Sequence, residues 1–106
     1  MTTITVAKDF AQYPFGRFRT DGDYSGQRFR EEFLEKELKR GADVVTVVLD
    51  GARGLGSSFL EEAFGGLVRA GFEASVLDRR LNVVSKDATR IAQIKGYIIE
   101  AQEKKR

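Results

Sequence analysis

The sequence predicts an α/β fold: one small domain, residues 1–106, in which helices pack on a mixed four-stranded sheet. Three observations support this. Residues 44–49 form an apolar, mostly β-branched run with the composition of a strand inside a sheet. Apolar residues recur at helical spacing in three other segments, one before this run and two after it. The patterns follow one another as strand, strand, helix, strand, helix, strand, helix, an order that is typical of βα units around one core.

The first two strands are predicted near the start of the chain. Ile4 and Val6 alternate with their neighbours, which is the period of a half-buried strand. The chain is expected to turn at Pro14. Basic and aromatic residues then alternate over residues 16–20, and the turn residues 21–23 follow. This pattern predicts a second strand, hairpinned to the first.

The first helix and the central strand come next. Ser25 is a suitable N-cap, and Gly41 can end the helix in a left-handed conformation. The run at 44–49 has no alternation, so we expect a core strand covered on both faces. The apolar stripe of the helix is Phe29, Phe33, Leu34 and Leu38.

The second half of the chain predicts a loop, three helices and a strand. A Gly-rich loop over residues 50–58 leads into a helix that begins at its serines and that Gly71 can end. Residues 72–80 favour a short helix, and residues 81–85 the last strand. Asp87 can cap the final helix. The apolar stripes of the two longer helices are Phe59, Leu60, Ala63, Phe64, Leu67 and Val68, and then Ile91, Ile94, Ile98 and Ala101.

Composition excludes several kinds of chemistry. Cysteine and histidine are both absent, which removes disulfides, thiol nucleophiles, imidazole bases and the usual zinc or haem ligands. We therefore expect no metal site, no cofactor and no enzymatic activity. Lys and Arg number 18 against 16 Asp and Glu, so a nucleic-acid partner is disfavoured. No run of about 18 apolar residues occurs, and we expect a soluble, cytoplasmic protein with no membrane partner.

Two stretches of the sequence resemble a known family. Residues 25–30 read Ser-Gly-Gln-Arg-Phe-Arg, and residues 57–67 read Ser-Ser-Phe-Leu-Glu-Glu-Ala-Phe-Gly-Gly-Leu. With residues 16–19 and 80–85, they resemble the STAS-like domain family of unassigned function, which is related to the STAS domains of anti-sigma factor antagonists. The resemblance spans nearly the whole chain and implies a STAS-like fold.

The resemblance also implies a regulatory role. Anti-sigma factor antagonists carry Asp-Ser-Ser-Gly at the start of this helix, and a partner kinase phosphorylates the second serine. In this chain Gly56 stands at the Asp and Phe59 at the Gly, whereas the serine pair is kept. Ser58 is therefore the first phosphorylation candidate and Ser57 the second. The implied partner is a GHKL-type ATPase or kinase, or an anti-sigma factor.

The residues themselves leave simpler alternatives open. Ser57 or Ser58 can cap the helix, and Asp50 at the end of the core strand can order the loop by accepting backbone N–H groups. The loop glycines fit neither common phosphate-loop spacing, and positive φ angles explain them. Gly65 and Gly66 indicate close packing against a strand. The predicted partner or ligand surface comprises Asp50, Arg53, Gly56, Ser57, Ser58, Glu61 and Glu62.

Arginines near the start of the chain form a second candidate site. Guanidinium groups bind phosphate or carboxylate through paired hydrogen bonds. The anion-binding candidates are Arg17, Arg19, Ser25 and Arg30. The alternative is that these arginines pair with acidic residues at 21, 23, 31 and 32. Phe18 and Phe29 are expected in the core.

Two functions remain open at this stage. We expect a non-enzymatic, regulatory protein-interaction module that uses the 50–60 loop and the helix after it. The alternative is a sensor of a small anionic ligand or nucleotide, held by the arginines and the Gly-rich loop.

Overall fold

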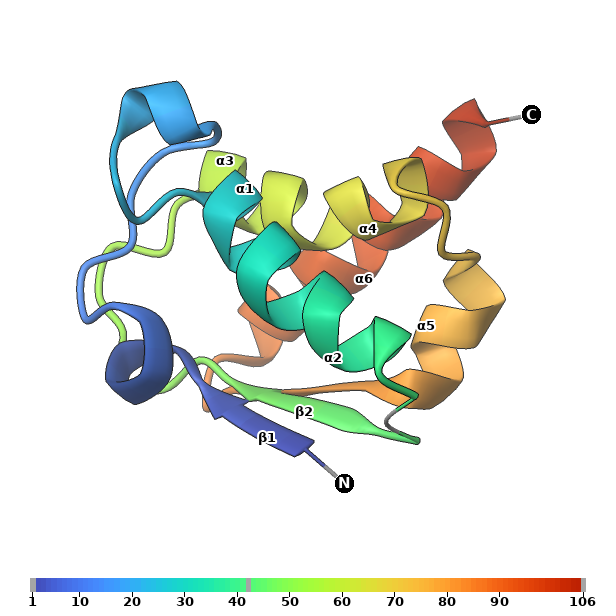
Figure 1. Cartoon of the computed structure of the whole chain (residues 1–106), viewed down its shortest axis with the longest axis horizontal. Helices are drawn as coiled ribbons and strands as arrows, with labels where there is room; N and C mark the ends of the chain where they lie inside the picture. The colour runs from blue at the N-terminus through green and yellow to red at the C-terminus, as the bar shows by residue number, and fades with distance from the viewer. Residues whose placement is uncertain (1, 42, 106) are drawn as a thin grey trace.

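The sheet has three parallel strands. The computed structural model describes residues 2–41 and 43–105 (Figure 1). Strands β1 (Thr2–Thr5), β2 (Val45–Val48) and β3 (Leu81–Val84) pair in the order β1-β2-β3. The α/β class is confirmed. The mixed four-stranded sheet is not, because the described residues form three strands and both pairings are parallel.

Two continuous helices, two single ones and two short helical segments, η1 (Val6–Phe10) and η2 (Arg19–Asp21), complete the described part of the fold. Helices α1 to α4 and α6 lie over the same face of the sheet, and α5 leads directly into β3 (Figure 1). The short helix predicted within 72–80 is confirmed by α5 (Ala74–Arg80), and the last helix is α6 (Ala88–Lys104). The first continuous helix joins α1 (Gly26–Phe29), η3 (Arg30–Leu34) and α2 (Glu35–Lys39), and the second joins α3 (Ser57–Leu60), η4 (Glu61–Gly65) and α4 (Gly66–Arg69).

The predicted second strand is wrong. Residues 16–20 curl into a short 3-10 turn, η2 (Arg19–Asp21), because the Asp21 carboxylate accepts the backbone N–H groups of Arg17 and Phe18 at 3.1 and 2.9 Å. Gly16 allows the curl with a φ of 91°. The carbonyls of Gly16 and Arg17 then accept N–H groups from the start of α1, at 3.0 and 2.9 Å. These bonds replace the hairpin that the alternation suggested.

The core strand is covered on one face only. Val45 and Val47 are buried under the helices, whereas Thr46 and Val48 are half-buried on the other face. The prediction that residues 44–49 are covered on both faces is therefore wrong. The chain passes from β1 to β2 to β3 across the sheet in one direction. Because both crossovers have the same hand, their helices lie on the same side of the sheet.

The predicted caps at Ser25 and Asp87 and the predicted terminal glycines Gly41 and Gly71 are confirmed. Ser25 Oγ accepts the Arg28 N–H at 3.2 Å, and Asp87 Oδ1 accepts the Thr89 N–H at 3.0 Å. Gly41 and Gly71 end their helices with φ angles of 89° and 115°. The aromatic part of the core contains Phe29, whose ring stacks on Phe33 with centroids 5.6 Å apart.

Candidate functional site

The serine loop, residues 50–58, joins the carboxyl end of β2 to helix α3. Gly51 and Gly54 adopt φ angles of 96° and 70°, as the glycines were predicted to do, but Gly56 has an ordinary φ of −77°. Leu55 is buried and anchors the loop. The Arg53 N–H donates to the carbonyl of Gln12 at 2.8 Å, which holds the loop against the connection between β1 and α1. The loop therefore has a defined backbone.

The two serines are exposed at the first helical positions. Gly56 is the N-cap of α3, and no side chain caps this helix. The prediction that Ser57 or Ser58 caps it is wrong, because the helix begins one residue earlier than a serine cap would require. Both serine residues are exposed. Their role as phosphorylation sites stays a prediction.

Asp50 orders the end of the loop. Its Oδ1 accepts the backbone N–H of Lys86 at 2.9 Å, so the carboxylate links the loop after β2 to the loop after β3. This agrees with the structural interpretation of Asp50. Its neighbour Arg53 is exposed, as the predicted surface requires.

A hollow of about 480 Å³ lies beside the serines. Residues from the connection between β1 and α1, among them Phe15 and Arg17, form one wall, and Gly56, Ser57 and Ser58 form another. The hollow thus brings the serine pair next to a segment some forty residues earlier in the chain. The sequence patterns do not predict that Phe15 lies beside the serine pair.

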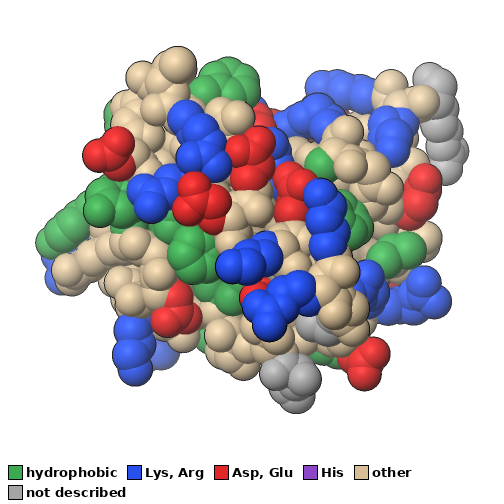
Figure 2. Space-filling view, in the orientation of Figure 1, with side chains coloured by type: hydrophobic (Ala, Val, Ile, Leu, Met, Phe, Trp, Pro, Cys, Tyr) green, Lys and Arg blue, Asp and Glu red, His purple; other side chains and the backbone are tan. Residues whose placement is uncertain are grey.

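The connection between β1 and α1, which forms one wall of this hollow, carries several exposed aromatic side chains. Tyr13, Phe15, Phe18 and Tyr24 are 64, 70, 47 and 46% exposed. Figure 2 shows hydrophobic side chains reaching the surface at this end. The expectation that Phe18 lies in the core is wrong, because its segment is a surface turn and not a strand. In the sequence, the density of aromatic residues around the single Pro14 is the feature that indicates this exposed aromatic surface.

The anion-binding candidates lie in an arginine–glutamate cluster between α1–α2 and α3–α4. Arg17 pairs with Glu61 at 2.5 Å, and Arg19 pairs with Glu31 and Glu32 at 2.9 and 3.1 Å. Figure 2 shows acidic and basic side chains interspersed over this face. The cluster comprises Arg17, Arg19, Arg28, Arg30 and Arg69 with Glu31, Glu32, Glu35, Glu61 and Glu62. Ser25 is buried and serves as a helix cap.

Arg30 occupies the most buried part of this cluster. Its guanidinium bonds to Glu62 and, at 2.8 Å, to Glu35. Burial alone would lower the pKa of Arg30, but these bonds outweigh it and the pKa lies above its ordinary value. Glu62 is only 6% exposed, so its prediction as a surface residue is wrong. A Cβ on Gly66 would collide with the Arg30 guanidinium, so this glycine makes room for an arginine of a helix and not for a strand.

Glu61 lies closer to the surface. Hydrogen bonds from Arg69 first, and then from Arg17, hold the pKa of its carboxyl below the ordinary value, although partial burial acts in the opposite direction. Arg69 Nη1 donates to Glu61 at 2.8 Å. Glu61 therefore has internal partners and is not a free acidic group at the helix start.

The described residues contain neither a cluster of metal ligands nor a helix suited to a membrane. Within residues 2–41 and 43–105, no group of three or more Asp or Glu side chains is arranged to hold a metal ion. In the same ranges, no helix combines the length and the apolar character needed to cross a membrane.

Comparison with known proteins assigns a family. The family described as STAS-like domain of unknown function (DUF4325) matches residues 25–89, more than half of the chain. The chain belongs to this family. No curated protein and no solved structure matches the chain. The matched part of the STAS-like domain contains the serine loop and most of the arginine–glutamate cluster, whereas β1 and the exposed aromatic residues precede it.

Proposed function

We propose that this STAS-like domain is a non-enzymatic regulatory module that binds a protein partner through the serine loop and the start of α3. The observation that carries the proposal is the exposed pair Ser57 and Ser58, free of capping, in one hollow with the exposed ring of Phe15. Aromatic residues are enriched at protein interfaces, and exposed apolar groups that gather at one place commonly mark such sites. The loop glycines and Arg53 complete this surface.

The partner implied by the family resemblance is a GHKL-type ATPase or kinase, or an anti-sigma factor. A phosphate on Ser58 would add roughly −1.5 to −2 charges at a helix start, where the helix dipole and free N–H groups stabilise anions. The fold would tolerate the group because the hydroxyl is exposed. The docking surface, by contrast, would change its charge. Phosphorylation of Ser58 would therefore alter binding without unfolding the domain.

The alternative function, a sensor of an anionic ligand or nucleotide, has less support. Arg17, Arg19 and Arg30 each contact at least one carboxylate. An anion would have to displace these carboxylates to bind. The serine loop also lacks a lysine of the kind that a phosphate-binding loop uses.

A binding experiment with matched variants tests the proposal. The probe is a purified GHKL-type ATPase from the organism that encodes this chain, and the measurement is titration calorimetry. Phe15→Ala removes an aromatic side chain from the hollow and should weaken binding about tenfold. Ser58→Glu should change the affinity, whereas Ser58→Ala should not. Thr89→Glu is the matched control, because it places the same charge in the first turn of another helix, α6.

The outcomes separate the surface from the switch. A loss with Phe15→Ala but none with Ser58→Glu would keep the interaction surface and remove the phosphorylation switch. Equal affinities for all four variants and the parent would overturn the proposal. A thermal-shift panel of nucleotides tests the sensor alternative, since a ligand at 100 times its Kd stabilises by about 2.7 kcal/mol. A clear shift would favour the sensor.

A further inference from the structure

The sheet has two outer edges, on β1 and on β3, and their backbone groups can be assigned. The Leu49 N–H donates to the Val84 carbonyl at 2.9 Å, so Val84 directs its backbone groups toward β2. Backbone groups alternate sides along a strand. Val83 therefore directs its N–H and C=O away from the sheet. By the same argument, the Thr2 N–H bond to Val44 at 3.1 Å leaves Thr3 and Thr5 directed outward from β1.

Acidic side chains lie along the β1 edge. The outward N–H of Thr5 donates to Asp9 Oδ2 at 2.7 Å. Thr2 Oγ1 bonds to Glu37 at 3.4 Å, and the hollow beside Ile4 is also lined by Glu31 and Glu32 of η3. Charged groups at an edge strand oppose the addition of another strand. This edge is protected in that way.

The β3 edge lacks such protection. The four residues Leu81–Val84 include no charged side chain, and no side chain in residues 2–41 or 43–105 bonds to the outward groups of Val83. The Leu81 N–H already donates to Leu77, which leaves the Leu81 carbonyl and both groups of Val83 for a new strand. An open edge of this kind is a template for strand addition.

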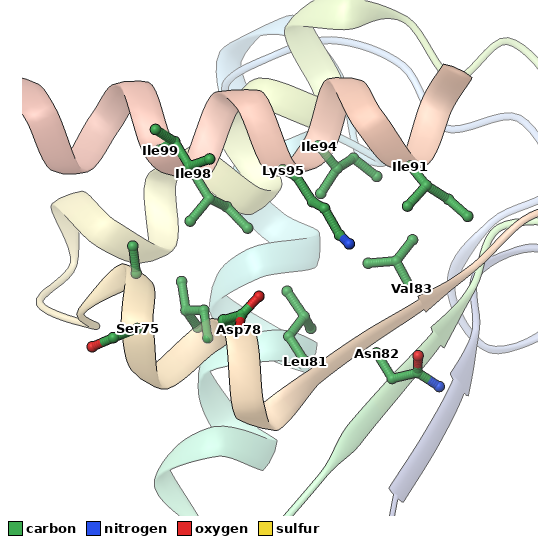
Figure 3. A pocket seen from close by; sticks show the side chains of 12 residues that line it. Ser75, Asp78, Leu81, Asn82, Val83, Ile91, Ile94, Lys95, Ile98 and Ile99 are labelled. Carbon is green, nitrogen blue, oxygen red and sulfur yellow. The ribbon is translucent and has the colours of Figure 1, made fainter. Parts of the chain in front are cut away.

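An apolar groove of about 500 Å³ adjoins this edge, between α5, β3 and α6. Figure 3 shows Leu81 and Val83 on one side of the groove and the isoleucines of α6 on the other. Ile99 in its wall is 57% exposed, although its side chain is large and apolar. The groove lies where the inward side chains of an added strand would go.

Two charged side chains add polar recognition at the groove. Asp78 of α5 and Lys95 of α6 line it from different walls, and Lys95 reaches into the space between them (Figure 3). Neither takes part in an ion pair within the described parts of the chain. They are complementary to a segment that carries one basic and one acidic residue.

We infer that the β3 edge and its groove bind an extended segment of a partner protein as a fourth strand. Its alternate side chains are apolar and enter the groove, its backbone pairs with Leu81 and Val83, and its charged residues meet Asp78 and Lys95. Main-chain hydrogen bonds give such complexes their affinity, and pockets for alternate side chains give specificity. This surface is separate from the serine loop.

A displayed peptide library tests the inference. The probes are ten-residue peptides with Val, Ile, Leu or Phe at alternate positions, selected on the intact chain and then measured singly by fluorescence anisotropy. Val83→Pro removes the outward N–H but keeps the bonds to β2, so it should weaken binding about tenfold or more. Thr3→Pro is the matched control on the β1 edge and should bind like the parent. Ile99→Lys should also weaken binding, and its exposed position keeps the test valid if Val83→Pro fails to fold.

Four results would overturn the inference. Three concern binding: no peptide is enriched, Val83→Pro binds as tightly as the parent, or Val83→Pro and Thr3→Pro lose equal affinity. The fourth is a peptide-induced shift of backbone amide NMR signals from residues remote from β3. Sedimentation of the chain alone tests the other possible occupant of this edge, a second copy of the chain. Self-association that protects the Val83 amide from exchange would assign this edge to a second copy instead.

Discussion

The serine loop and the arginine–glutamate cluster are both rich in polar groups, but they differ in where their partners lie. In the loop, Ser57 and Ser58 face solvent, and no capping bond engages them. In the cluster, Arg17 meets Glu61 from 44 residues away, and Arg30 meets Glu62 from 32 residues away. The arginines of the cluster, which look like a ligand site in the sequence, already have carboxylate partners within the fold. Substitutions in the cluster should therefore affect stability, and substitutions in the loop should affect binding.

The largest expected effect is at Glu62. Glu62→Ala leaves the Arg30 guanidinium without its most buried partner and should lower the free energy of unfolding by about 3 kcal/mol. Urea denaturation followed by circular dichroism measures this change. The control is Glu100→Gln, which removes an exposed pair with Lys104 and should cost less than about 0.5 kcal/mol. Similar values for the two variants would contradict the internal role of the cluster.

Two glycine substitutions with opposite expected effects on stability come next. Gly66→Ala should destabilise by about 2 kcal/mol, because the added methyl group meets the Arg30 side chain in a packed site. Gly96→Ala lies in α6 with nothing near its Cβ, so it should stabilise by about 0.5 to 1 kcal/mol through helix propensity. Thermal and urea unfolding of both variants would check the signs. A stabilising Gly66→Ala would show that the guanidinium has room to move.

Serine substitutions then separate structural from exposed hydroxyls. Ser25→Ala removes a buried helix cap and should cost about 1 to 2 kcal/mol. Ser57→Ala and Ser58→Ala should each change the free energy of unfolding by less than about 0.5 kcal/mol, since neither hydroxyl caps α3. If either loop serine cost as much as Ser25, the loop would have to be counted with the structural sites.

The smallest effect is the pH dependence from Glu61. Its pKa is lowered in the folded state, so the stability it contributes is present above its unfolded pKa and is lost as the pH falls through its folded pKa. Arg69→Gln should remove part of this loss on acidification, an effect of about 0.5 kcal/mol for a partly exposed pair. Urea denaturation between neutral pH and the acid range measures it. Arg79→Gln, an exposed arginine on α5, should keep the parental acid dependence.

The sequence predicted the helices better than the sheet. Helical signals are local: the Ser25 and Asp87 caps and the terminal glycines lie within a few residues of the groups they satisfy. The predicted strand at 16–20 failed because Asp21 and the start of α1 compete for its backbone groups. A run of β-branched residues shows that a strand is buried, but not on how many faces. The number of covered faces depends on the side of the sheet on which the crossover helices lie.

The candidate site was located but incompletely described. The strand, loop and helix pattern placed the serine loop correctly. It could not show that Gly56 takes the cap position, because one residue of shift changes no periodicity. It also could not show that Glu62 is buried, since its partner Arg30 belongs to another helix. Contacts between distant segments carry this information, and one sequence does not contain it in readable form.

Gly66 and Arg30 also lead to an expectation about sequence variation. A guanidinium at position 30 and a side chain at position 66 exclude each other in this packing. The two positions should therefore covary among related chains: arginine at 30 should occur with glycine at 66, and relatives with a larger residue at 66 should carry a shorter one at 30. Glu62 should lose its acidic character in those relatives, because a buried carboxylate without the arginine would be costly.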